Sequence, residues 1–200
     1  MKQLLIATNN KGKIKELQDL LKDTGIELVT PSQVDLKLDV IEDGKTYAEN
    51  STKKAIAFAE TSHLVSLADD SGLEVDALSG APGLYSARYS PKPNATDKDR
   101  RLYLLKNLKV KPRPWTARFR ATIAIAIPNG EIHLAEGICE GEIIPEERGT
   151  GGFGYDPIFL LQTLGKTMAE LSMDEKNRLS HRARAVMKAK PVLIHILKLS

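Results

Sequence analysis

Apolar and polar residues follow one another in a pattern that predicts a strand, a loop and a helix at the start of the chain. Residues 4–7 form a continuous apolar run, Leu-Leu-Ile-Ala, which is typical of a strand covered on both faces. A polar loop follows at residues 8–13, and apolar residues then recur at helical spacing over residues 14–21. A second short strand is expected at residues 27–30.

Capping patterns and periodicity predict the later helices. Thr46 and Glu49 match a capping box, which opens a helix that runs to about residue 61. Another helix is expected over residues 96–108. Its inward-facing residues are expected to be Leu102, Leu105 and Leu108. Near the C-terminus, the segment 172–175 is a further capping box, and Ser180 can cap a second helix.

A long hairpin is expected in the middle of the chain. Apolar residues alternate with others from Thr116 to Ile127, which is a strand pattern. The pair Asn129-Gly130 favours a tight turn, and residues 132–144 return as the partner strand, broken by Gly137 and Gly141. We interpret this hairpin as scaffold.

The segment 66–76 carries the most suggestive chemistry. An apolar run leads into Asp69, Asp70, Ser71 and Gly72, and apolar residues then resume, which predicts a strand, a polar tip and a strand. Neighbouring side chains of an extended chain point to opposite faces, so one carboxylate is expected to face a cleft or solvent. The group can hold a divalent cation and orient a water, or it can be a polar hairpin that bonds its own backbone.

Two other polar segments have two interpretations each. The segment 8–13 brings a hydroxyl, amides, lysines and free helix amides to one place, which suits an anion, although it lacks the Walker A pattern. The alternative is a plain helix cap by asparagine, with the lysines in solvent. In the acidic segment 34–44, Glu42 can be surface, or it can reach a metal that Asp70 also contacts.

A glycine-rich segment forms the last candidate site. Four glycines lie within residues 149–154, and Phe153 and Tyr155 supply ring faces, with Asp156 next to them. A binding loop is favoured over a flexible connector because aromatic residues lie at its centre. Further along, Lys176 and His181 can share a pocket only if the helix restarts between them, and a histidine in a basic helix is more often a surface residue. Arg88 lies between two tyrosines in a loop made rigid by glycine and proline. It can bind phosphate, stack on a ring, or hold the loop in place as a structural arginine.

Composition narrows the classes of function. The chain has 200 residues, a net charge of +3 and 5% aromatic residues. These values argue against a nucleic-acid binder, which needs a basic surface and stacking platforms. The single cysteine, Cys139, forms no intramolecular disulfide and is expected in the core. No stretch approaches the ~18 apolar residues of a membrane span, and the N-terminal run is too short for a signal peptide, so we expect a cytoplasmic protein without a membrane partner.

Five motifs in order give the chain a resemblance to the inosine triphosphate pyrophosphatase family, over nearly its whole length. They are the segments 8–13 (TNNKGK), 68–73 (ADDSGL), 82–89 (PGLYSARY), 151–157 (GGFGYDP) and 180–182 (SHR). Each motif alone is weak, but the ordered set is specific.

The resemblance implies an activity and an architecture. The family hydrolyses inosine, deoxyinosine and xanthosine triphosphates to the monophosphate and pyrophosphate with Mg²⁺. Its fold is α/β, with a long, twisted mixed sheet flanked by helices and two lobes that enclose the active cleft. We therefore expect residues 1–200 to form a single two-lobed domain, and a homodimer.

The resemblance also assigns residues. It makes Asp70 the general base and a metal ligand, with Glu42 as the second ligand; since Asp43-Gly44 replaces the family's Thr-Gly pair, Asp43 stays an alternative to Glu42. The phosphate-binding positions would be Thr8, Asn9, Asn10, Lys11, Gly12 and Lys13. The other substrate-binding positions would be Ser71, Phe153, Gly154, Tyr155, Asp156, Lys176, His181 and Arg182.

These assignments predict a mechanism and its competitors. Water oriented by Asp70 would attack the α-phosphorus, and Lys13 and Lys176 would offset the developing charge. A donor that meets the 6-oxo group of inosine or xanthosine would face the 6-amino group of adenine, which disfavours ATP. The alternatives are a pyrophosphatase of modified pyrimidine nucleotides and a sensor that binds nucleotide without hydrolysing it.

Overall fold

The computed structural model describes residues 2–198, and the chain divides into two compact units. Unit 1 comprises Met1–Asp70, Ala121–Gly137 and His181–Ser200, and unit 2 comprises Ser71–Arg120 and Ile138–Ser180. Residues 1, 199 and 200 of the expected 1–200 domain lie outside the described part. The two units are considered separately below, and the cleft expected between two lobes stays a prediction.

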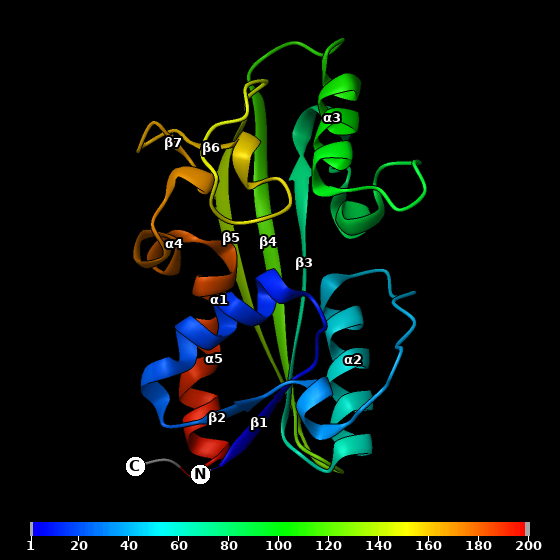
Figure 1. Ribbon diagram of the computed structural model, residues 1–200, viewed down its shortest axis with the longest axis vertical. Helices are drawn as coiled ribbons and strands as arrows, with labels where there is room; N and C mark the ends of the chain where they lie inside the picture. Colours follow the sequence, from blue (N-terminus) through cyan, green and yellow to red (C-terminus); the bar gives the residue numbers. More distant parts are fainter. Residues whose placement is uncertain (1, 199–200) are drawn as a thin grey trace. The chain divides into compact units, whose positions relative to one another are not determined.

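The chain has the expected α/β fold, built on a seven-stranded sheet of order β2-β1-β3-β4-β5-β6-β7 (Figure 1). Its strands are β1 (Gln3–Ile6), β2 (Glu27–Val29), β3 (Ser66–Val75), β4 (Trp115–Ala126), β5 (Ile132–Ile143), β6 (Phe159–Leu161) and β7 (Lys166–Thr167). Strand β1 pairs in parallel with β2 and β3, whereas β6 pairs antiparallel with β5 and β7, so the sheet is mixed. Sequence analysis did not identify β7.

Strand β3 corrects the expectation of a polar tip. It runs without interruption from Ser66 to Val75, so Asp69 and Asp70 lie within a strand and not at a turn. The polar residues are tolerated there because both carboxylates have cationic partners, described below. Likewise, β5 is continuous through Gly137 and Gly141, which the sequence suggested would break it.

In unit 1, helices cover both faces of the strands (Figure 1). The helices are α1 (Lys11–Leu21), α2 (Tyr47–Ser62) and α5 (His181–Ile196). One apolar cluster joins α1 and α5 to one side of β1, β3 and β4, and includes Leu17, Ile123 and Leu193. A second cluster packs Phe58 and Ala59 of α2 against the other side. The two faces of β3 therefore meet different helices.

Unit 2 contains α3 (Asp97–Leu108) and α4 (Met173–Leu179) and its own apolar core. Leu104 and Leu108 enter this core with Phe159 and Cys139, and the cysteine is buried as expected. The predicted inner face of α3 is partly wrong, because Leu102 is exposed while Arg101 and Leu104 are buried. On its 101–104–108 stripe, Arg101 donates to Glu147 and to the Gly154 carbonyl oxygen, which allows a charged residue to lie inward.

Several local predictions are confirmed. Thr46 caps α2 and Ser172 caps α4 in a capping box, and α4 ends before α5 starts at His181. Asn129, with φ of 52°, makes the turn between β4 and β5. The segment around Arg88, expected as a rigid loop, contains a 3₁₀ helix, Gly83–Arg88. Within residues 2–198, no helix is both long enough and apolar enough to cross a membrane.

Candidate active site

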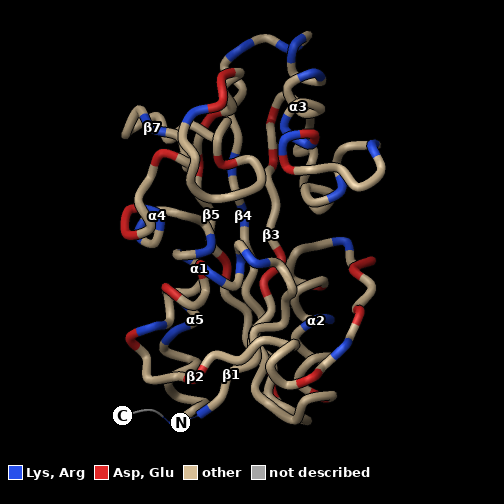
Figure 2. The backbone as a smooth tube through the Cα atoms, viewed as in Figure 1, with Lys and Arg blue, Asp and Glu red and all other residues tan. Residues whose placement is uncertain are grey.

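Asp69 and Asp70 point to opposite faces of β3, and each joins a different cluster of charged side chains in unit 1. Asp69 is 1% exposed and Asp70 is 7% exposed, so neither carboxylate faces open solvent, and the other alternative, that one of them faces a cleft, stays a prediction. Burial of a carboxylate costs free energy unless cations and hydrogen-bond donors replace water. The two clusters supply these partners, and Figure 2 marks their charged positions along the chain.

The Asp69 cluster consists of Asp69, Lys13, Arg182 and Glu16. Lys13 Nζ lies 3.0 Å from Asp69 Oδ2 and also donates to the Asp69 carbonyl oxygen. Arg182 donates from Nε and Nη2 to the same carboxylate oxygen at 3.1 and 2.8 Å, and from Nη1 to Glu16 Oε2 at 2.5 Å. The cluster thus links α1, β3 and α5 through side chains removed from water.

Ionisation in this cluster follows from its composition. Burial disfavours the Asp69 carboxylate, but Arg182 and Lys13 together hold its pKa well below the usual range. Burial also disfavours the charged Arg182, and Asp69 and Glu16 nevertheless raise the pKa of its guanidinium. For Lys13, burial dominates over the attraction of Asp69, so the pKa of its ammonium is lowered. Asp69 and Arg182 are therefore a permanent ion pair.

The Asp70 cluster consists of Asp70, Lys54, Glu42 and Asn50. Lys54 Nζ lies 3.1 Å from Glu42 Oε1 and 4.0 Å from Asp70 Oδ1, and it donates to the Asp69 carbonyl oxygen at 3.1 Å. Asn50 hydrogen-bonds Asp70 and accepts from the Gly44 N–H at 2.8 Å, which ties the acidic segment to β3. Burial raises the pKa of Asp70 despite Lys54 and Lys13, as suits a proton acceptor.

Glu42 is better placed than Asp43 as a partner of Asp70. Glu42 and Asp70 both face the Lys54 ammonium, so their carboxylates converge on one cation. Asp43 instead pairs with the exposed Lys53 at 2.5 Å. Among residues 2–198 no group of three or more potential ligands of the His, Cys, Asp and Glu types occurs. Two carboxylates still suit Mg²⁺, which commonly takes one or two from protein and the rest from phosphate and water.

In the segment 8–13 the asparagine helix cap is confirmed, and anion binding stays a prediction. Asn10 is the N-cap of α1, and its side chain accepts from the Gly12 and Lys13 N–H groups at 2.9 and 3.1 Å. Thr8 Oγ1 accepts from the Asn10 N–H at 3.2 Å. Lys13 turns inward to Asp69 and does not lie in solvent. The helix cap and an inward cation therefore occur together.

In unit 2, the glycine-rich segment is folded around Asp156. Its Oδ2 accepts from the Phe153 N–H at 2.8 Å and from Lys176 Nζ at 2.6 Å, and Asp156 and Lys176 are both buried. The Lys176 ammonium lies 5.3 Å from the centre of the Phe153 ring. A side chain at Gly152 would come within 2.0 Å of Asp156, so glycine is required there. Phe153, Asp156 and Lys176 are thus brought together.

The end of α4 settles one conditional prediction. Ser180 is the C-cap of α4, with ψ of 156°, and α5 begins at His181, so the helix does restart. His181 is 5% exposed and is not the surface residue that a basic helix usually carries. Lys176 belongs to unit 2 and His181 to unit 1, so a pocket shared by both stays a prediction. Ser71 is partly buried in β3, and its contact with substrate stays a prediction too.

Four residues of these clusters escaped sequence reasoning: Glu16, Asn50, Lys54 and Asp69 in its role as ion-pair partner. Lys54 carried a usable signal, because it lies next to Ala55 and four positions before Phe58, on the buried face of α2. Glu16 is likewise a carboxylate next to the buried Leu17 of α1. Their partners lie too far along the chain for any local pattern to reveal.

Comparison with known proteins places this geometry in a family. The family model described as Ham1 family matches residues 4–192. The chain belongs to the Ham1 family. Among Ham1 relatives, the dITP/XTP pyrophosphatase of Desulforamulus reducens is 52% identical over 193 residues, covering 96% of this chain and 95% of the relative. That of Bacillus subtilis is 43% identical, covering 96% and 98%. The family expected from the five motifs is thereby confirmed.

Solved Ham1 structures share the fold. A HAM1 protein from Coxiella burnetii aligns with a TM-score of 0.87 at 38% identity, covering 98% of this chain and 100% of that one. The Staphylococcus aureus Ham1 protein aligns with a TM-score of 0.83 at 38% identity, covering 96% and 98%. The similarity extends over both units, so neither is an addition to the family fold.

Proposed function

We propose that this protein hydrolyses dITP, ITP and XTP to the nucleoside monophosphate and pyrophosphate. The observation that carries the proposal is the Asp70 cluster, in which a buried carboxylate with a raised pKa shares the Lys54 ammonium with Glu42. A proton acceptor next to a cation-binding carboxylate suits attack of water on a phosphoryl group. The curated Ham1 relatives named dITP/XTP pyrophosphatases support the choice of substrate.

The triphosphate is proposed to bind at the start of α1. The residues concerned are Thr8, Asn9, Asn10, Lys11, Gly12 and Lys13, with Ser71 on β3. The positive end of the α1 dipole favours an anion, and the Lys13 and Lys54 ammonium groups act electrostatically on the Asp70 carboxylate. In the reaction, Asp70 accepts the proton of the attacking water, and the two lysines offset the negative charge that develops on the phosphate oxygens.

Mg²⁺ is the proposed metal, with Glu42 and Asp70 as its protein ligands. Their carboxylates converge on one positive charge, the Lys54 ammonium, and this arrangement supports the proposal of a cation site. Bound there, the ion would neutralise triphosphate charge and polarise the phosphoryl oxygens. The ligand set of oxygen donors alone is typical of a hard divalent cation.

The purine is proposed to bind to the glycine-rich segment of unit 2. Phe153 offers a ring face and Tyr155 carries a backbone amide. Gly154 provides the positive φ between them, and the Asp156–Lys176 pair fixes the turn. His181 and Arg182, which belong to unit 1, remain proposed substrate-binding residues. For Arg182 we propose an indirect part, because its Nε, Nη1 and Nη2 atoms already donate to Asp69 or Glu16.

The preference for 6-oxo purines follows from hydrogen-bond matching. A donor that meets the 6-oxo group of hypoxanthine or xanthine would face the 6-amino donor of adenine. An unmatched buried polar group can reduce kcat/KM by ~10⁴-fold, far more than a missing methylene. We therefore expect ATP to be a poor substrate.

The test measures pyrophosphate release from dITP, XTP, GTP and ATP with and without Mg²⁺, for the wild type and Asp70→Asn. We expect metal-dependent release from dITP and XTP, and a loss of about a thousandfold or more in Asp70→Asn with nucleotide binding retained. Asp23→Asn, at an exposed carboxylate of unit 1, is the matched control and should keep wild-type rates.

Each other outcome has a definite meaning. Near wild-type turnover in Asp70→Asn would overturn the role of this carboxylate. Tight binding of dITP without release of pyrophosphate would indicate a nucleotide sensor. Pyrophosphate release from modified pyrimidine triphosphates alone would indicate a pyrophosphatase of modified pyrimidine nucleotides. Folding of the variants is checked by thermal unfolding.

We also propose a homodimer that acts in the cytoplasm on the nucleotide pool. The family resemblance supports this setting. Sedimentation equilibrium measures the assembly directly, and a monomer mass at micromolar concentration would contradict the dimer.

A further inference from the structure

Helix α3 binds both polar backbone groups of Gly154 in unit 2. Asp97 Oδ2 accepts from the Gly154 N–H at 2.8 Å, and Arg101 Nη1 donates to the Gly154 carbonyl oxygen at 2.7 Å. Asp97 and Arg101 are four positions apart, so they lie on one face of the helix. Together they fix the two peptide groups on either side of the Gly154 Cα.

The conformation at Gly154 needs such support. Its φ is +61°, in the left-handed region, and a side chain built there would meet nothing within 4 Å. Packing around Cα therefore does not hold this residue in place. Glycine is free to adopt many backbone conformations, and fixing one costs conformational entropy. The hydrogen bonds from α3 are the interactions that select the observed conformation.

Glu147 prepares Arg101 for this contact. Its two carboxylate oxygens accept from Arg101 Nε and Nη2 at 3.0 and 2.9 Å, in a bidentate pair that leaves Nη1 for Gly154. Arg101 is 9% exposed, so it is a structural cation and not a surface side chain. Its burial also explains why α3 turns Leu102 outward.

The neighbours of Gly154 are fixed independently. The Tyr155 hydroxyl donates to the Ser86 carbonyl oxygen at 2.9 Å, and Asp156 binds the Phe153 N–H and Lys176. Gly154 lies between these anchored residues, and its dihedral angles set the direction of the Phe153 ring relative to Tyr155. A rotation there would change the direction of the Phe153 ring relative to Tyr155.

We propose that Asp97 and Arg101 are positioning residues for purine recognition: α3 holds the Gly154 backbone so that Phe153 presents its ring to the base. This inference rests on the proposed function of the glycine-rich segment as the purine site. Neither residue contacts the base in this scheme. Their contribution is to keep the binding surface in one conformation before the nucleotide arrives, which lowers the cost of ordering on binding.

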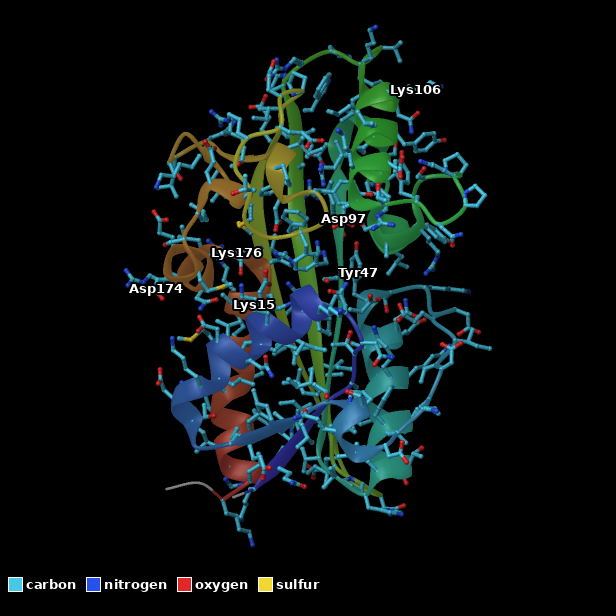
Figure 3. All side chains as sticks on the ribbon, in the orientation of Figure 1. Lys15, Tyr47, Asp97, Lys106, Asp174 and Lys176 are labelled. Atoms are coloured by element: carbon cyan, nitrogen blue, oxygen red, sulfur yellow. The ribbon has the colours of Figure 1, made fainter. Side chains whose placement is uncertain are left out.

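The experiment compares Asp97→Ala and Arg101→Met with Lys106→Met, a control on the same helix. Figure 3 labels Asp97 and Lys106 at opposite ends of α3, and Lys106 is exposed. KM and kcat are measured with dITP, and inorganic triphosphate serves as a competitive inhibitor that reports on phosphate binding alone. Phe153→Ala is the reference for loss of the base contact.

The charge-assisted hydrogen bonds from Asp97 and Arg101 stabilise the conformation of Gly154 that binds the base. We therefore expect KM for dITP to rise roughly tenfold or more in Asp97→Ala and Arg101→Met. The value of kcat should stay within about twofold, because uniform binding is lost and not transition-state stabilisation. The inhibition constant of inorganic triphosphate should not change. Asp97→Asn retains an acceptor oxygen for the Gly154 N–H and should raise KM by less than about threefold.

A second readout reports on the loop itself. Hydrogen exchange at the Gly154 amide, followed by NMR, should be faster in Asp97→Ala than in the wild type and Lys106→Met, because Asp97 protects that N–H. If Asp97→Ala does not fold, the test uses Asp97→Asn and Arg101→Lys. Arg101→Lys should raise KM for dITP, because lysine lacks the guanidinium group that binds Glu147 and Gly154 at the same time.

The outcomes separate the inference from the function on which it rests. If Phe153→Ala raises KM but the α3 variants do not, the positioning role is overturned and the purine site stands. If Phe153→Ala leaves KM unchanged as well, the segment is not the purine site and both are overturned. A fall in thermal stability with an unchanged KM would reduce Asp97 and Arg101 to structural residues.

Discussion

Asp69 and Asp70 are neighbours with opposite ionisation behaviour. Arg182 and Lys13 stabilise the Asp69 carboxylate, whereas burial raises the pKa of Asp70. The difference arises from the strand geometry, which sends the two side chains to different helices. One carboxylate is thereby a permanent ion-pair partner, and the next is suited to accept a proton.

At the residue scale, we predict that Arg182→Met destabilises the protein by about 3–5 kcal/mol, because it leaves Asp69 and Glu16 buried without the guanidinium that pairs with both. The measurement is the free energy of unfolding in urea. Arg184→Met, at an exposed position of the same helix, is the control and should cost less than about 0.5 kcal/mol. A loss below about 1 kcal/mol in Arg182→Met would contradict the prediction.

Lys54 and its neighbour Lys53 give a second residue-scale prediction. Lys54→Met should lower kcat/KM by about a hundredfold or more, since it removes the cation that holds Glu42 and Asp70 together. Lys53→Met should change it less than about twofold, because Lys53 pairs with the exposed Asp43. A loss in Lys53→Met with little change in Lys54→Met would argue that Asp43 and not Glu42 serves the reaction.

At the scale of elements, Gly137 determines how α5 approaches β5. A Cβ at this position would lie 2.0 Å from the His181 carbonyl oxygen and 2.5 Å from the Ala185 nitrogen, both backbone atoms. The start of α5, which carries His181 and Arg182, can therefore pack directly on the strand only if residue 137 is glycine. What the sequence suggested to be a strand breaker is a packing requirement.

Gly137→Ala should accordingly cost about 2 kcal/mol or more, because backbone atoms must shift to admit the methyl group. The control is Gly165→Ala, where nothing lies within 4 Å of the added carbon and the cost is the positive φ alone, about 1 kcal/mol. Urea unfolding measures both. A cost no greater than that of the control would show that α5 can move away without penalty.

At the scale of the whole molecule, the described carboxylates with lowered pKa values give a common pH dependence. They are Asp43, Asp69, Asp76, Asp97, Asp99, Glu147, Glu170 and Glu175. Most are fixed by hydrogen bonds from helix caps or by cationic partners. Asp70, with its raised pKa, acts in the opposite direction.

We therefore predict that stability falls as the pH falls through the ordinary carboxyl values of 3.8 and 4.5 and below them. A lowered pKa in the folded state means that the unfolded chain binds more protons in this range, so acid favours unfolding. Urea midpoints at pH 6, 4 and 3 measure the effect. Asp97→Asn should weaken this dependence, and an equal midpoint at all three pH values would contradict the prediction.

Much of this protein follows from the sequence alone, because the forces concerned are local. The strand, loop and helix at the N-terminus, the caps at Thr46 and Ser172, and the Asn129-Gly130 turn depend on residues within a few positions of one another. The order of the five motifs was enough to indicate the Ham1 family. Candidate site residues were also visible, because polar groups next to apolar runs need a reason to be there.

The tertiary structure alone decided which charges meet. Arg182 lies 113 positions from Asp69 and 166 from Glu16, and Arg101 lies 53 positions from Gly154. No local pattern specifies such pairs, because they form only when distant elements pack and water is excluded. Because Asp69 and Asp70 have cationic partners, β3 continues without interruption through both carboxylates. Because Arg101 has hydrogen-bond partners, it is buried on α3 while Leu102 is exposed. Burial of a charge is decided by its partner, and partners are set by the fold.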